Sequence, residues 1–137
     1  MNTTSLTTTT TTAPRFSLSE PTKQLLRLAA AVPVLSHKMR VEVSDDGKSL
    51  RYFGKPPWLQ AHPLRQEELT FDAPKFACEI DSWSAGEQHA ALWLLNVWNP
   101  GWAKTEGHRF DLFAAVGTLD SSNLNAIAGW MVNPVWP

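Results

Sequence analysis

The longest apolar stretch of the chain runs from Ala90 to Trp98, and Asn96 is its only polar residue. A run this broad is typical of a helix that is enclosed on most sides. Ser84 and Glu87 have the spacing of a capping box, so we expect this helix to begin just after Ser84. Asn99-Pro100-Gly101 predicts its end, because proline disfavours helical geometry in the residue before it.

Helical spacing of apolar residues recurs in three other segments. Leu25, Leu28 and Val32 follow a possible helix start at Ser17 or Ser19, and Pro33 is expected to end that helix. Residues 110–117 predict a short helix. Residues 121–132 predict a longer helix with Asp120 as its cap.

Alternating polar and apolar residues from Met39 to Val43 predict a strand. Asp46-Gly47 is a strong hairpin signal, because a two-residue type I′ loop needs positive φ at both turn positions. With this loop, Val43 faces Leu50 and Glu42 faces Arg51. The apolar pairs and the opposite-charge pair agree on one register, so we predict a hairpin over residues 39–54.

Leu69 and Phe71 also alternate with polar residues and predict a third strand. Residues 76–80 alternate in the same way and favour a fourth strand, although a helix leading into Ser84 stays possible. Residues 54–65 contain three prolines and are expected to be irregular. The predicted fold class is α+β: an N-terminal helix, an antiparallel sheet of about four strands, and three C-terminal helices packed on one face around Trp93.

The composition of the 137 residues, 43% hydrophobic with a net charge of −1, indicates one domain with a real core. Residues 1–16 are rich in threonine and predict a disordered tail, so the domain is expected over 17–137. Cys78 is the only cysteine, which excludes an intramolecular disulfide and favours a cytoplasmic location. Leu25 to Leu35 is too short to cross a membrane.

The sequence contains no H-x-x-x-H, C-x-x-C, Gly-rich phosphate loop or G-x-S-x-G motif. Reactive residue types are densest at Cys78, Glu79, Asp81 and His89. In a strand, Cys78 would lie on the apolar face as an inert thiol. Glu79 and Asp81 would share the other face and could bind a divalent cation with His89 or His108, so an unrecognised hydrolase or metal enzyme is one hypothesis. We expect no cofactor and favour a non-enzymatic role.

Aromatic residues carry the leading functional hypothesis, a Trp- and Pro-rich surface that binds another protein. Trp58 and His62 lie in the proline-rich segment, and Trp102 and Trp136 lie near predicted helix ends. Exposed tryptophans bury much area at low entropic cost, which makes them good contact residues. The alternative, in which these rings fill the core, stays open.

Basic residues carry a second hypothesis. Lys38, Arg40, Lys48 and Arg51 are predicted on or beside the hairpin, where they could bind nucleic acid weakly and in a salt-dependent way. The oligomeric state is not decided by the sequence.

Ser84, Gly86 and Glu87 open an apolar helix that ends in Trp98-Asn99; Asp111-Leu112 and then Leu119, Asp120 and Asn123 follow. This arrangement resembles a pattern found in small uncharacterised bacterial and phage proteins. The resemblance implies a prokaryotic or phage helical module from Ser84 onward, with no activity or site attached.

Overall fold

The computed structural model describes residues 17–137, so the predicted disordered tail over 1–16 lies outside the described residues. These residues form an α+β structure, which confirms the predicted class. The helices are α1 (Glu20–Ala31), α2 (Pro33–Met39), α3 (Ala73–Glu79), α4 (Ala85–Trp98), α5 (Pro100–Thr105), α6 (Leu112–Thr118) and α7 (Ser121–Val132), with a 3-10 turn, η1 (Ile80–Ser82), between α3 and α4. The strands are β1 (Ser17–Leu18), β2 (Val41–Val43), β3 (Leu50–Tyr52), β4 (Leu59–Ala61) and β5 (Glu68–Phe71).

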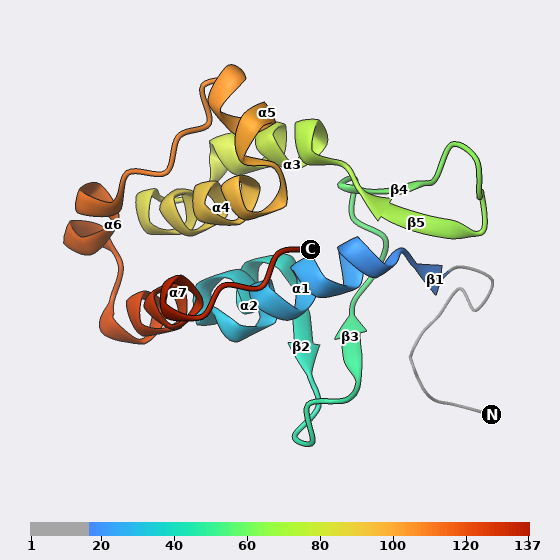
Figure 1. Cartoon of the computed structure of the whole chain (residues 1–137), viewed down its shortest axis with the longest axis horizontal. Coiled ribbons are helices and arrows are strands. Elements are labelled where there is room, and N and C mark those ends of the chain that lie inside the picture. The colour runs from blue at the N-terminus through green and yellow to red at the C-terminus, as the bar shows by residue number, and fades with distance from the viewer. Residues whose placement is uncertain (1–16) are drawn as a thin grey trace.

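Helix α4 is the central element, as its sequence predicts. The capping box is formed: the Glu87 N–H donates to Ser84 Oγ at 3.4 Å, and the Ser84 N–H donates to Glu87 Oε1 at 2.9 Å. The helix contacts α1, α2, α3, α5 and α6, so other helices cover it on most sides (Figure 1). Leu94 and Leu95 have no exposed surface, and Trp93 is 2% exposed.

Pro33 ends α1, as predicted, but it also begins the unpredicted helix α2. Proline suits the first position of a helix because its fixed φ fits and its missing N–H would have had no partner there. Val32 cannot cap α2 with its side chain. Instead, Asn123 of α7 accepts the Val34 N–H at 2.8 Å, which ties the C-terminal helix α7 to the start of α2.

Strands β2 and β3 form the predicted hairpin in the predicted register, with Val43 opposite Leu50 and Glu42 paired with Arg51. The turn differs from the predicted type I′. Only Gly47 has a positive φ, and the Asp46 carboxylate accepts the Lys48 N–H at 2.9 Å. The first strand begins at Val41 rather than Met39, because Met39 ends α2.

The strands form two separate sheets instead of one four-stranded antiparallel sheet. The second sheet has the order β1-β5-β4, in which β1 is parallel to β5 and β4 is antiparallel to it. Gly54, at φ 73°, and Pro56-Pro57 lead the chain away from β3, and prolines cannot donate to a sheet ladder. The segment over residues 54–65, which was expected to be irregular, contains strand β4. The other residues of this segment separate the two sheets.

Residues 73–79 form helix α3, so the predicted strand over 76–80 is wrong. Asp72 caps this helix by accepting the Lys75 N–H at 3.0 Å, and Pro74 lies in its first turn. Phe76 and Ile80 face the core with helical spacing, while Cys78 is exposed instead of lying on an apolar face. The alternation that suggested a strand also fits a helix, and the capping residue decides between them.

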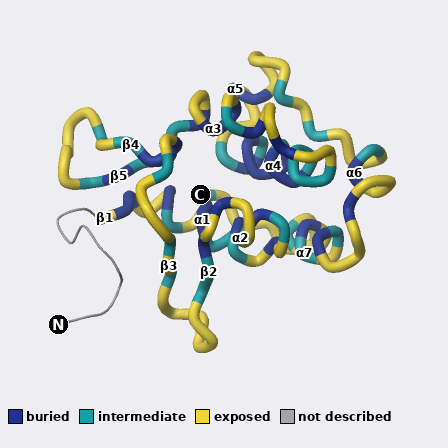
Figure 2. The backbone as a smooth tube through the Cα atoms, turned by 180° about the vertical axis from the view of Figure 1, so that it is seen from behind, coloured by how far each residue is buried: buried dark blue, intermediate teal, exposed yellow. Residues whose placement is uncertain are grey.

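The core is one connected cluster that extends from Leu18 to Ile127. Figure 2 shows buried positions concentrated along α4 and on the sides of α1 and α2 that face it. Helices α5 and α6 pack on α4, whereas α4 itself packs on α1 and α2, and α7 packs on α2. The prediction had placed the C-terminal helices on a sheet. In Figure 1 the β1-β5-β4 sheet lies at one end of this helical body, and the β2–β3 hairpin extends downward from α1.

The capping box makes stability depend on pH. The hydrogen bond from the Ser84 backbone N–H, together with the Ser84 hydroxyl and the nearby Lys38 ammonium, lowers the pKa of Glu87 below its ordinary value of 4.5. Below pH 4.5 the unfolded chain therefore binds more protons at this site than the folded chain. The stabilisation is present above pH 4.5 and is lost as pH falls through the lowered pKa.

We therefore expect Glu87→Gln to make the free energy of unfolding less sensitive to acid than in the wild type. Urea unfolding measured at several values between about pH 6 and pH 3 checks this. Glu67→Gln, which changes an exposed carboxylate, is the control. Parallel pH profiles for Glu87→Gln and the wild type would contradict the expectation.

Candidate functional site

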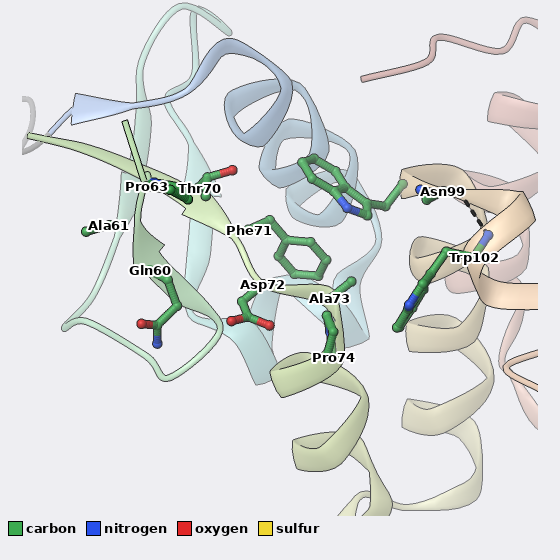
Figure 3. A pocket seen from close by; sticks show the side chains of 11 residues that line it. Gln60, Ala61, Pro63, Thr70, Phe71, Asp72, Ala73, Pro74, Asn99 and Trp102 are labelled. Carbon is green, nitrogen blue, oxygen red and sulfur yellow. Dashed lines mark hydrogen bonds between the residues drawn. The ribbon is translucent and has the colours of Figure 1, made fainter. Parts of the chain in front are cut away.

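A hollow of about 360 Å³ lies where the β4–β5 sheet meets the start of α3, the end of α4 and α5. The hollow is shallow and open to solvent. We call it the Trp102 groove; it is lined by Gln60, Ala61, Pro63, Thr70, Phe71, Asp72, Ala73, Pro74, Trp98, Asn99 and Trp102. Figure 3 shows Gln60, Pro63 and Asp72 on one side and Trp102 on the other, with Phe71, Ala73 and Pro74 between them.

Trp102 forms the outer wall of the groove and is held in place from two sides. Its backbone N–H donates to Asn99 Oδ1 at 3.0 Å, and its ring lies 5.3 Å from the His108 ring, centroid to centroid. Asn99 therefore ends α4 and also caps α5, so the predicted stop at 99–101 is correct and the next helix begins there. The half-buried Trp102 side chain is fixed by this short helix.

Aromatic rings connect the groove to the core. Trp98 packs against Phe71 at 5.1 Å between ring centroids, and Phe71 packs against Phe76 at 5.2 Å. Trp58 contacts Phe71 and Phe76 at 6.0 Å and 5.9 Å. The tilted and edge-to-face geometries are those that aromatic pairs prefer, so the floor of the groove is a rigid part of the core.

Asp72 is the only charged residue that lines the groove. Its Oδ1 atom caps α3, and its backbone N–H donates to the Trp58 carbonyl at 2.7 Å. Gln60 is also tied down, because its Nε2 donates to the Pro57 carbonyl at 2.6 Å. The groove thus combines apolar and aromatic walls with one negative charge.

The four contact residues predicted from the sequence lie in different parts of the structure; they are Trp58, His62, Trp102 and Trp136. Trp58 is 1% exposed and lies beneath the groove, whereas Trp102 lines it. His62 lies in the β4–β5 turn, where its Nδ1 accepts the Leu64 N–H at 3.0 Å and the Arg65 N–H at 3.2 Å. Trp136 is 57% exposed and packs edge-to-face against Trp130, which in turn contacts Trp93.

Three of the four candidate basic residues contact other side chains of the chain. Lys38 lies 3.7 Å from Glu87 and 5.6 Å from the Trp83 ring centroid, and Arg51 pairs with Glu42. The Arg40 guanidinium lies 5.9 Å from the Phe53 ring centroid. Lys48 is exposed in the hairpin turn.

The reactive residues near α3 are not gathered into a metal site. Within residues 17–137, no group of three His, Cys, Asp or Glu side chains could hold a metal ion, so Glu79, Asp81 and His89 do not form one. Cys78 is exposed on α3 and has no disulfide partner. The geometry of the described residues therefore offers no support for metal-assisted hydrolysis at this cluster.

Comparison with known proteins finds no matching family model, no matching curated protein and no matching solved structure. The resemblance of the C-terminal motifs to small bacterial and phage proteins therefore stays a prediction. Between Ser17 and Pro137, no helix has the length and apolar character needed to cross a membrane.

Sequence reasoning identified Trp102 but missed the residues around it, chiefly Asp72, Pro74 and Trp98. Asp72 followed by Ala73-Pro74 is a helix-start signal. This signal, taken as the start of a helix, would have predicted α3 correctly. No sequence signal indicates that this turn meets the end of α4, because that contact depends on long-range packing.

We expect Trp58→Ala to lower the free energy of unfolding by about 3–5 kcal/mol, since it leaves a cavity among packed aromatic rings. Leu64→Ala is the control: this side chain is 87% exposed, and such surface changes typically stay within about 0.5 kcal/mol. Urea unfolding measures both. A Trp58→Ala effect as small as that of the control would contradict the buried placement.

Proposed function

We propose that this protein is a non-enzymatic interaction module that binds an extended segment of another protein in the Trp102 groove. The observation that carries the proposal is the combination of preorganised aromatic walls with the single charge of Asp72. The proposal develops the leading hypothesis from the sequence and centres it on Trp102.

The aromatic wall supports binding because the groove loses little conformational entropy when a ligand binds. Before any ligand arrives, Asn99 already holds the Trp102 backbone N–H, and the His108 ring packs against the Trp102 ring. A tryptophan that lines the same groove as Pro63 and Pro74 offers a large apolar contact at low entropic cost. Residues of this kind dominate the binding energy of protein interfaces.

The charge of the groove indicates the chemistry of the partner. Asp72 Oδ1 is used by the helix cap, which leaves Oδ2 for a ligand. A Lys or Arg side chain could pair with this carboxylate and lie near the Trp102 ring, where a cation is also favoured. We therefore expect a basic residue next to an aliphatic residue or proline in the bound segment.

The edge of the sheet favours an extended ligand. Strand β4 is the outer strand of its sheet, and its ladder bonds to β5 involve the Trp58 carbonyl and the His62 N–H. In an antiparallel pair the intervening residues alternate, so the N–H and C=O of Ala61 point to the outer edge. Ala61 also lines the groove, and a peptide added there could use both backbone pairing and the aromatic wall.

The other hypotheses receive less support from the described residues. Lys38 and Arg51 are paired with acids, which reduces the basic face available to nucleic acid. A cytoplasmic location fits the lone exposed Cys78. The interaction role is therefore the function that the geometry supports best.

A phage-displayed library of random peptides, selected on the purified protein, tests the proposal. We expect enrichment of peptides with Lys or Arg beside an apolar residue, and weaker binding at higher salt. Trp102→Ala should weaken binding of the selected peptides at least about tenfold, as loss of a central aromatic contact does. Binding can be measured by calorimetry.

Two variants sharpen this test. Asp72→Asn keeps a good N-cap for α3 but removes the charge, so it should lower the affinity and the salt dependence without unfolding the protein. Trp136→Ala removes an exposed tryptophan outside the groove and should leave the affinity unchanged. Failure to enrich any peptide, or equal binding by Trp102→Ala, would refute the proposal.

A further inference from the structure

The lining of the Trp102 groove is rich in aromatic rings and poor in charge. Of the 11 residues that line it, three carry aromatic rings, namely Phe71, Trp98 and Trp102. Among these lining residues Asp72 is the only charged one, and it is negative. The face of an aromatic ring attracts a cation, and tryptophan does so most strongly. The lining therefore favours a positively charged group.

The three rings line this hollow from two sides. Phe71 and Trp98 contact each other at 5.1 Å between ring centroids, with their planes 68° apart. Trp102 lies across the groove from Phe71, and Ala73 and Pro74 lie between them (Figure 3). A group that enters the groove therefore meets aromatic rings on both sides and apolar side chains between them.

The polar side chains of the groove already take part in hydrogen bonds of the protein itself. Asn99 Oδ1 accepts the Trp102 N–H at 3.0 Å, and Gln60 Nε2 donates to the Pro57 carbonyl at 2.6 Å. Asp72 Oδ1 accepts a backbone N–H at the start of α3 at 3.0 Å. A ligand therefore meets one carboxylate oxygen outside the helix cap, Oδ2, and amide groups that already have partners.

This supply of acceptors selects among cations. A guanidinium has five N–H donors and pairs best with both oxygens of a carboxylate, but Oδ1 of Asp72 is used by the helix cap. A primary ammonium is strongly hydrated and carries three donors. A trimethylated ammonium keeps its charge and has no N–H donor. It therefore needs no acceptor, and its methyl groups can contact the rings directly.

We propose that the cation bound in the Trp102 groove is a trimethylated lysine side chain of the partner segment. This inference rests on the proposed function and narrows the chemistry of its ligand. The rings of Trp98 and Trp102 contact the methyl groups, and the carboxylate of Asp72 balances the charge. Aromatic cages recognise quaternary ammonium groups in the same way.

Synthetic peptides test this inference on the full chain. A peptide from the phage selection is made in three forms, with lysine, trimethyllysine or a neutral tert-butyl analogue of trimethyllysine at its basic position. We expect the trimethylated form to bind at least about fivefold more tightly than the lysine form. The neutral analogue keeps the shape of the methylated group but lacks its charge, so it should bind more weakly than the trimethylated form. Calorimetry measures the three affinities.

Variants of the chain assign the preference to the rings of the groove. Trp102→Ala should abolish the preference for the trimethylated form, whereas Trp102→Phe should keep part of it, because phenylalanine attracts a cation less strongly than tryptophan. Trp136→Ala is the matched control: this tryptophan is 57% exposed but lies outside the groove, so the full preference should remain. Circular dichroism checks that each variant is folded.

The outcomes separate this inference from the proposed function. Equal affinities for the lysine and trimethyllysine forms would overturn the inference and leave the proposed function standing. Equal affinities for the trimethylated form and its neutral analogue would also overturn it, because the contact would then be apolar and not cationic. A selection that enriches no peptide would refute both. In that case, choline binding that Trp102→Ala abolishes would assign the groove to a free quaternary ammonium ion instead.

Discussion

The burial of α4 is the packing interaction on which the rest of the structure depends. This helix has a single polar residue in its second half, so no single neighbouring element could cover it. Five other helices do so, and residues such as Leu94 and Leu95 lose all contact with water. Each fully buried side chain of this kind contributes about 1.5–3 kcal/mol relative to an exposed one. The two small sheets are left at the side of the helical body, where they complete the core but do not organise it.

Once α4 is enclosed, its ends become the places where the chain must turn at the surface. Asn96 connects the loop after α5 to helix α4. Its Nδ2 donates to the Leu92 and His108 carbonyls, both at 2.8 Å. The loop after α5 is thereby held against the helix. Asn99 begins α5 at once, which places Trp102 opposite the start of α3. The groove is thus a consequence of how two helix ends are capped.

Charge is distributed unevenly over this fold. The hairpin and the segment around Lys38 pair most of their basic groups with acids or aromatic rings. The groove keeps one carboxylate, and residues 112–137 contain a single charged side chain, that of Asp120.

Local patterns in the sequence determined much of the secondary structure. The start and end of α4, the cap of α7 at Asp120 and the register of the β2–β3 hairpin all depend on residues a few positions apart, and the structure agrees with each. Short segments were ambiguous. Residues 76–80 fit both a strand and a helix, and Pro33 and Pro100 begin helices where the pattern indicated only an end.

Tertiary structure decided the features that depend on distant residues. The parallel pairing of β1 with β5, the burial of Trp58 and the meeting of Asp72 with Trp102 join segments that are far apart in the chain. Their geometry follows from how the helices cover α4, which no local pattern encodes. The sequence shows that residues 112–137 are almost free of charged side chains. Which of their apolar side chains are exposed depends on how α6 and α7 pack. Local sequence therefore determined the longest helices and the β2–β3 hairpin, because their signals lie a few residues apart. Long-range burial decided the short elements and which side chains remain available for contact.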